Sequence, residues 1–400
     1  MQKYTDSENN DPFKKIRRFN DEEVPQVMDK LVSNFIFRKA LRYSLNFLPI
    51  SWSNEQKELF LRELGEVKSS DGLQKHTLTF IDNLLKNTTS DITVTGLDKL
   101  DKNKNYIFIS NHRDILTDPF IINHSLYTNY FNTPINAFGN NLSFAYLGDF
   151  LRSIKSMVVM REKMQKSSPW MTFLKATGAV RFQKTDGELK DEMYKQSKYI
   201  LQELRDGESV WIAQSAGRTK NGIDRTYNRI LLMFALEGRK QRISFGDYFN
   251  EFSVVPVSIS YEKEPCEVQK AKELYVKDKK GSYKKTPLED LFNIGAGLKA
   301  DKGNVRVNFS EPVSGKDLSS LTTKIDEGVI GGYKLSKLNV SAYNLKHDDD
   351  LFGLGTEDIN NHLQSLDIKP KQLGQYQSHI LNIYAGPVES KKEFGLEVRL

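Results

Sequence analysis

The 400-residue chain has a single cysteine, Cys266. One cysteine excludes an internal disulfide, and this scarcity fits a reducing compartment such as the cytoplasm. The chain also lacks any run of about 18 consecutive apolar residues, the length that a membrane-spanning helix needs. Residues 1–15 are polar and charged, so we expect no signal peptide. If the protein acts on lipid, these absences predict that it works from the membrane surface.

The sequence also has no internal repeats and no low-complexity blocks. It has no cluster of residues with metal-ligand spacing, so we expect no metal site. What is present is an ordinary globular composition, 38% hydrophobic and 28% charged, with a net charge of +6. Excess positive charge favours anionic partners such as a membrane surface or phosphates. Because the charge is spread along the chain, we expect no nucleic-acid partner.

The pattern of elements predicts three regions: a mostly helical region 1–90, an α/β domain 91–312 and a helical C-terminal region 313–400. In the middle region, short strands alternate with helices, which is typical of a sheet covered on its faces. Strands are expected at 91–96, 105–110, 156–160, 209–214, 253–261 and 304–309, and helices at 145–155, 188–206 and 226–239. In the last strand Val305, Val307 and Phe309 should face one side.

The stretch "IFISNHRDILTDPF" (107–120) is the first candidate site. A short apolar strand ends in Ser110-Asn111-His112, and Asp114 and Asp118 follow. An imidazole can accept a proton from an alcohol while a carboxylate fixes its tautomer. Sites in α/β sheets gather at the carboxyl ends of strands, which favours catalysis here. A solvated surface loop remains the alternative.

Two further strands end in cationic segments. "SMVVMREK" (156–163) places Arg161 and Lys163 after a strand, and the arginine fork suits phosphate. "SVWIAQSAGRTKNG" (209–222) runs into small residues and then Arg218 and Lys220, where Ala216-Gly217 allows close approach of backbone N–H groups. Read alone, each segment is equally compatible with a surface ion pair or an ordinary basic loop.

A proline interrupts the strand-like run "FSVVPVSISYE" (252–262). Since proline donates no ladder hydrogen bond, Pro256 predicts a sheet edge, a bulge or a bend. This cluster is expected to serve structure.

In this order, the four segments resemble the blocks of the glycerolipid acyltransferases, a family that includes bacterial lysophosphatidate and glycerol-3-phosphate acyltransferases. The resemblance covers roughly residues 90–270, and residues 325–343 also look like the C-terminal extension of one bacterial branch. It implies an α/β acyltransferase-like domain with a central mixed sheet flanked by helices, and helical extensions on both sides.

The resemblance also implies roles for individual residues. His112 matches the catalytic base of the first block, and Arg161 matches the second-block arginine that holds the acceptor's phosphate. Gly217 and Arg218 fall on the third block, part of the same acceptor site, and Pro256 stands where the fourth block has its proline.

The first block departs from the family's pattern in its spacing. The family places an aspartate with four residues between it and the histidine, and that position is Thr117 here. A threonine can hydrogen-bond an imidazole but cannot neutralise an imidazolium. The partner of His112 is therefore either Asp118, reached by a one-residue bulge in the turn, or Asp114. We favour Asp118.

The third block departs in its charge. The family reads Glu-Gly-Thr-Arg there, whereas this chain reads Ser215-Ala216-Gly217-Arg218. Gln214 is the nearest polar substitute for the glutamate, and it carries no charge. The departure bears on how the acceptor is bound, and it leaves room for altered or weakened activity.

The implied reaction moves a fatty acyl group from acyl-CoA or acyl carrier protein to the free hydroxyl of 1-acylglycerol 3-phosphate, giving phosphatidate. His112 acts as general base, Asp118 or Asp114 orients it, and Arg161 and Arg218 hold the phosphate with help from Lys163 and Lys220. No cofactor beyond the thioester co-substrate is expected. We expect a cytoplasmic protein on the inner face of the cell membrane, with a lysophospholipid acceptor.

Two alternatives stay open at this point. The acceptor could be glycerol 3-phosphate or another lipid alcohol, or the chain could be a non-catalytic lipid-binding protein with the same fold. Residues 31–50 are the best candidate for membrane contact, since Phe35, Phe37, Tyr43 and Phe47 are interspersed with cations. A helix packed on the core with its cations in solvent fits that segment as well.

Overall fold

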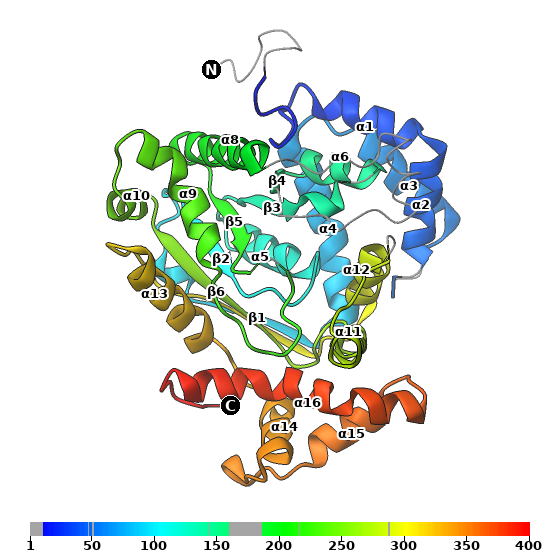
Figure 1. Ribbon diagram of the computed structural model, residues 1–400. Helices are drawn as coiled ribbons and strands as arrows, with labels where there is room; N and C mark the ends of the chain where they lie inside the picture. The colour runs from blue at the N-terminus through cyan, green and yellow to red at the C-terminus, as the bar shows by residue number, and fades with distance from the viewer. Residues whose placement is uncertain are drawn as a thin grey trace.

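The computed structural model of the protein describes residues 11–46, 48–49, 52–143, 145–159, 186–215, 217–286 and 289–400. Among these residues, four helices precede the first strand, within the region 1–90 that was predicted to be mostly helical (Figure 1). They are α1 Val24–Ser33, α2 Phe35–Asn46, α3 Asn54–Gly65 and α4 Ser70–Thr88. Ser53 and Ser69 cap α3 and α4 by accepting hydrogen bonds from first-turn N–H groups.

The described strands form one mixed sheet in the order β1-β7-β6-β2-β5-β3-β4. Strands β6, β2, β5, β3 and β4 are mutually parallel, whereas β7 runs antiparallel to β6 and β1 runs parallel to β7. The bounds are β1 Asp91–Thr95, β2 Ile107–Ser110, β3 Ile135–Gly139, β4 Ser156–Val159, β5 Val210–Ala213, β6 Val254–Tyr261 and β7 Asn304–Phe309. This mixed sheet, flanked by helices, confirms the predicted fold class. Of the strands that the structure describes, all except β3 were predicted.

The remaining helices lie between and after the strands (Figure 1). Before β7 come η1 Leu97–Lys99, α5 Thr117–Thr128, η2 Asn140–Leu142, α6 Ala145–Ser153, α8 Asp186–Arg205, α9 Asn228–Lys240, α10 Phe245–Glu251, α11 Glu267–Lys280 and α12 Glu289–Lys299. After β7 come α13 Leu318–Gly331, α14 Lys337–His347, η3 Leu351–Gly353, α15 Glu357–Ser365 and α16 Pro370–Glu393. In the described residues, no helix combines the length and the apolar character needed to span a membrane.

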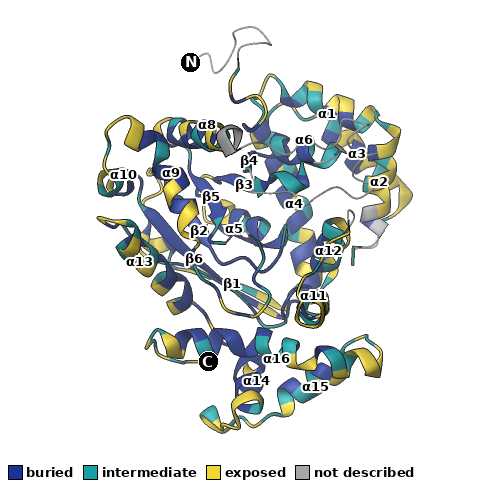
Figure 2. Cartoon of the chain, viewed as in Figure 1, coloured by how far each residue is buried: buried dark blue, intermediate teal, exposed yellow. Residues whose placement is uncertain are grey.

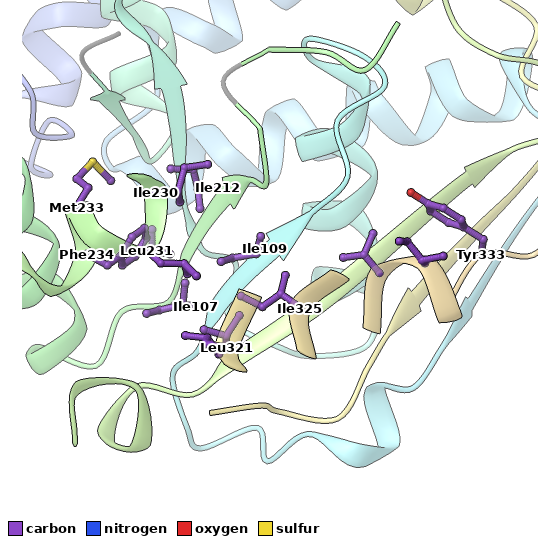
Figure 3. Close-up of a cluster of buried hydrophobic side chains, with 14 of the residues drawn as sticks. Ile107, Ile109, Ile212, Ile230, Leu231, Met233, Phe234, Leu321, Ile325 and Tyr333 are labelled. Atoms are coloured by element: carbon purple, nitrogen blue, oxygen red, sulfur yellow. The ribbon is translucent and has the colours of Figure 1, made fainter. Parts of the chain in front are cut away.

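Alternating side chains of the strands build a core on each face of the sheet. Ile107 and Ile109 of β2 and Ile212 of β5 face α9 and α13, as Figure 3 shows. Phe108 and Trp211 point to the opposite face, where α4 and α5 pack. Because both faces are covered, these strands are apolar throughout, and their polar residues begin only where the strands end.

Strand β7 has one buried face, as its alternating sequence predicted. Val305, Val307 and Phe309 are all buried and belong to the core cluster on the side of α4 and α5.

Pro256 lies in the middle of the sheet and not at its edge, so the edge interpretation is wrong. It pairs with Ile109 of β2, and its carbonyl oxygen accepts a hydrogen bond from Ser310 N at 2.9 Å. The ladder to β7 starts only at Val257–Phe309, and the Val254–Val313 bridge beyond it is out of register by one residue. The missing N–H therefore falls at an irregular step of the β6–β7 pairing, which agrees with the bulge interpretation.

The C-terminal helices reach back to the sheet and to its loops. Helix α13 packs on β6, and α16 packs on α14 and α11 (Figure 1). The loop after β5 touches α16 where Gly222, at φ +77°, meets Gly386. A Cβ atom on Gly386 would lie 2.6 Å from the carbonyl carbon of Gly222, so the two backbones are in direct contact.

Candidate active site

The turn after β2 carries His112 at the carboxyl edge of the parallel strands. β2 lies between β6 and β5, so its end is in the interior of the sheet. The Asn111 side chain fixes this turn to β6: its Nδ2 donates to Ile259 O at 2.9 Å and its Oδ1 accepts from Ile259 N at 2.8 Å. Ser110 Oγ accepts from Trp211 Nε1 at 3.0 Å and donates to Asn111 O, so it is occupied by structural bonds.

His112 pairs with Asp118. The distance from His112 Nδ1 to Asp118 Oδ2 is 2.9 Å. The same Oδ2 accepts from the backbone N–H groups of Arg113 and Asp114, at 2.6 and 2.9 Å, and Oδ1 accepts from the Tyr261 hydroxyl at 2.8 Å. An acceptor carboxylate places the proton on Nδ1, which leaves Nε2 as the nitrogen available to act as a base.

Asp114 has a different role, at the start of α5. Its Oδ1 accepts from Leu116 N at 3.2 Å and from Thr117 N at 2.9 Å, so it satisfies N–H groups at the helix N-terminus. The turn from Arg113 to Leu116 brings the side chain of residue 118, and not that of residue 117, to the imidazole of His112. The buried Thr117 hydroxyl has no hydrogen-bond partner among the described residues. Of the two predicted aspartates, the structure brings Asp118 to His112.

Tyr261 was not anticipated by the sequence reasoning. It lies at the end of β6, and burial together with the Asp118 carboxylate raises the pKa of its hydroxyl well above the usual value. It therefore stays protonated and donates to Asp118. The alternation of Val257, Ile259 and Tyr261 along β6 was the available signal, because it places Tyr261 on a buried face.

The loop after β5 contains Gly217 and Arg218 of the third block, and it lies beside the turn that carries His112. β5 pairs directly with β2, and Thr219 N donates to the carbonyl oxygen of His112 at 2.7 Å. Gly217, Arg218 and Lys220 line the same cavity as His112. A Cβ atom on Gly217 would meet nothing within 4 Å, so open space adjoins this backbone.

The predicted phosphate-binding cations are not equivalent. Lys220 forms an ion pair with Glu273 of α11, and burial lowers the pKa of its amine. Arg218 has a buried Nη1 without a hydrogen-bond partner in the part of the chain that the structure describes. Arg161 and Lys163 lie outside the described residues. Arg218 is therefore the described cation of this set with a nitrogen atom that no described group pairs with, and its charge also interacts with Asp290.

Gln214 does not supply a polar contact in place of the third-block glutamate. Its side chain is buried, and neither amide atom has a hydrogen-bond partner among the described residues.

The cavity that contains His112 and Arg218 has a volume of about 550 Å³. That is within the usual range for small-molecule sites. Much of the wall is apolar and comes from α5, β3, α6, β5 and the residues next to them, for example Leu116, Phe120, Phe138, Leu151, Ile154 and Ile212. Polar groups come from the loop after β5, the segment before α12 and α12 itself, including Ser215, Lys285 and Asp290. Such a site combines a base, a cation and an apolar wall.

The segment that forms this site resembles one family of known proteins. The family model described as Acyltransferase matches residues 91–260, the segment that contains His112, Asp118 and Arg218. No curated protein matches the chain. Among solved structures, the crystal structure of the 1-acyl-sn-glycerophosphate (LPA) acyltransferase PlsC from Thermotoga maritima is similar, with 15% sequence identity and a TM-score of 0.38. That match covers 75% of this chain and 94% of the other.

Proposed function

We propose, from the membership of residues 91–260 in the acyltransferase family, that the protein acylates 1-acylglycerol 3-phosphate to phosphatidate. The acyl donor would be a thioester, either acyl-CoA or acyl carrier protein. The observation that carries this proposal is one cavity lined by both His112 and Arg218, with Asp118 bonded to the imidazole behind it.

In the proposed reaction, His112 is the general base. Nε2 accepts the proton of the acceptor hydroxyl while the alcohol oxygen attacks the thioester carbon. The C–O bond forms, the C–S bond breaks, and the departing thiolate takes up the proton from the imidazolium. General-base catalysis of this kind contributes about 10²- to 10⁴-fold in rate. Asp118 stabilises the imidazolium, and Tyr261 holds Asp118.

The acceptor phosphate would pair with Arg218. A guanidinium with an unpaired buried N–H group gains most when a phosphate oxygen satisfies it. Lys220 would attract the phosphate more weakly, because its ammonium group already forms an ion pair with Glu273. Arg161 stays a proposed partner of the same phosphate on the strength of the family resemblance. Anchoring the phosphate would place the free hydroxyl near His112.

The apolar part of the cavity would take acyl chain. Its walls come from α5, α6 and β3, and the same helices pack against the N-terminal helices in a third buried cluster that includes Phe37, Leu45 and Leu151. The proposed reaction needs no metal and no organic cofactor beyond the thioester.

Helix α2 would be the membrane contact. Phe35, Ile36 and Tyr43 are 75%, 65% and 63% exposed, and Figure 2 shows α2 as one of the most exposed helices of the N-terminal region. The opposite side of α2 packs through Phe37 on α6, with ring centroids 6.1 Å from Tyr146. Phe47 lies outside the described residues. Exposed aromatic side chains on a cationic helix suit the headgroup layer of a bilayer.

The assay that tests the function uses radiolabelled acyl-CoA and acyl carrier protein thioesters with lysophosphatidate, glycerol 3-phosphate or no acceptor. We expect phosphatidate from the wild type and a loss of at least about 100-fold in His112→Ala. His124→Ala is the matched control, because His124 also bonds a carboxylate, Asp82, but does not line the cavity. Equal product from wild type and His112→Ala would refute the mechanism. If only glycerol 3-phosphate is acylated, it takes the place of lysophosphatidate as the proposed acceptor. If no acceptor gives product, the result favours a non-catalytic lipid-binding protein.

The membrane contact is tested separately by sedimentation with anionic vesicles. Replacing Phe35 and Ile36 with Ser should lower the bound fraction, since both side chains are exposed and apolar. Replacing the buried Phe37 tests packing and serves as a comparison. If the Phe35→Ser, Ile36→Ser protein binds the vesicles as well as the wild type does, α2 is not the membrane contact.

A further inference from the structure

Two loops of the site are joined by more than the sheet. The backbone bond from Thr219 N to His112 O is the first connection. The second runs through Arg113, the residue after the base, whose side chain turns away from the cavity and is buried. Its Nη2 donates to Asp224 Oδ2 at 2.6 Å and to Gly222 O at 3.2 Å. The turn after β2 is therefore bonded to the far end of the loop after β5.

Asp224 is the centre of this connection. It is 1% exposed, and both carboxylate oxygens are used. Oδ2 accepts from Arg113 and from the Tyr333 hydroxyl at 2.5 Å, while Oδ1 accepts from the Thr219 hydroxyl. Thr219 is next to Arg218 and bonds the His112 carbonyl through its own N–H. One carboxylate thus touches both loops.

The surrounding charges form a buried set of two cations and two carboxylates. Glu264 Oε1 lies 3.6 Å from Arg113 Nη1 and 2.5 Å from Lys270 Nζ. Burial opposes the charge on Arg113, but the carboxylates of Asp224 and Glu264 raise its pKa above the ordinary value. A guanidinium held this way keeps its charge and its orientation. Removing one member leaves another buried charge without its partner.

We propose that Asp224 is a positioning residue of the acyl-transfer site, which acts through Arg113 to hold the base-bearing turn against the loop that carries Arg218. It would supply a buried carboxylate to a third-block loop that lacks the family's glutamate. Because Arg113 N also donates to Asp118 at 2.6 Å, a shift of Arg113 alters the pair His112–Asp118 directly. The proposal rests on the proposed function for its kinetic consequence, whereas the structural link stands independently of it.

A double-mutant cycle tests the link. We expect Asp224→Asn and Arg113→Met each to lower kcat by about 10-fold or more while the KM for the acceptor changes less than about 3-fold. If Asp224 acts through Arg113, the double variant should be no slower than the slower single variant, because residues in one network do not act additively. Multiplicative losses in the double variant would overturn the proposal.

A second readout does not depend on activity. Hydrogen–deuterium exchange of the full chain, followed by mass spectrometry, should show faster exchange in peptides covering both 111–118 and 217–226 of Asp224→Asn. Asp326→Asn is the matched control: Asp326 is buried and accepts from Thr226 N at 2.8 Å, but it does not touch Arg113. It should loosen residues 217–226 and leave 111–118 unchanged.

The outcomes separate the two proposals. An inactive wild type with the expected exchange pattern would refute the acyltransferase function and keep the link. An active wild type whose Asp224→Asn variant shows normal exchange at 111–118 and normal kcat would refute the link and keep the function. If Asp224→Asn does not fold, Tyr333→Phe removes one bond to the same carboxylate, and we expect a smaller change of the same kind. No change in exchange or kcat in Tyr333→Phe would then count against the proposal.

Discussion

The turn after β2 and the loop after β5 lie side by side, but their polar groups are paired to different degrees. In the turn, the Asp118 carboxylate accepts four hydrogen bonds, from an imidazole, two backbone N–H groups and a tyrosine. In the loop, the Gln214 amide and Arg218 Nη1 are buried without a partner among the described residues. Leaving such groups unpaired costs about 1–3 kcal/mol each. We infer that the base is arranged before substrate arrives, whereas Arg218, which lines the cavity, is left for a ligand to pair with.

The strongest test of this contrast is Asp118→Asn. An amide in place of the carboxylate favours the wrong imidazole tautomer and cannot stabilise the imidazolium, so kcat should fall by about 10³- to 10⁴-fold. Steady-state acyl transfer measures this. Asp114→Asn is the comparison, since asparagine also caps a helix N-terminus and should lower kcat less than about 10-fold. A larger loss in Asp114→Asn would mean that the two aspartates are assigned in the wrong order.

Arg218→Met tests the unpaired side of the contrast. A charge-assisted hydrogen bond is worth about 1.5–3 kcal/mol, which corresponds to a rise of roughly 10- to 100-fold in the KM for the phosphorylated acceptor. The kcat should change less. Lys263→Met is the control, because Lys263 pairs with Asp301 on the surface, and its KM should match the wild type. An unchanged KM in Arg218→Met would leave the phosphate without its proposed partner.

Tyr261→Phe sharpens the claim that the base is arranged in advance. Losing one charge-assisted hydrogen bond to Asp118, worth at most about 1.5–3 kcal/mol, should lower kcat by about 10-fold with little change in KM, because the other bonds to the carboxylate remain. Tyr248→Phe is the matched control: its hydroxyl is buried and has no partner among the described residues, so its removal should leave kcat unchanged. Equal kcat in all three proteins would remove Tyr261 from the mechanism.

Gly386→Ala tests the support beneath the loop and should have the smallest effect. The new methyl group would collide with the Gly222 backbone, and we expect a loss of about 1–3 kcal/mol in the free energy of unfolding. Urea denaturation measures it. Gly374→Ala lies in the same helix, where a Cβ atom meets nothing within 4 Å, and should be neutral or stabilising by up to about 1 kcal/mol. Equal stability of both variants would mean that the contact yields without cost.

The sequence predicted most of the sheet, and the exceptions have physical reasons. Strand β3, Ile135–Gly139, was missed because "INAFG" has one β-branched residue and includes Asn, Ala and Gly, which are rare in strands. Helix α5 was missed because its apolar residues, such as Ile121, Ile122 and Leu126, show no single buried stripe against a polar face. The reversed direction of β7 depends on long-range pairing that local patterns do not encode.

For the site, the strand ends indicated where the two loops lie, and the family resemblance favoured Asp118 as the partner of His112, as the structure shows. The bonds that join the two loops could not be predicted. The apolar runs before His112 and Gln214 correctly placed both loops at one edge of the sheet, because parallel neighbouring strands end together. Which aspartate reaches the imidazole depends on where α5 begins, a matter of one residue. The bond between Arg113 and Asp224 joins positions 111 residues apart and leaves no periodic trace in the sequence.

The contacts with Tyr333 and Gly386 have a consequence for fragments of the molecule. Both residues follow the segment matched by the family model, yet they brace a loop that lies inside that segment. A fragment cut after residue 260 contains the whole matched segment but not these braces. In the proposed acyl transfer, such a fragment should therefore be far less active than the 400-residue chain.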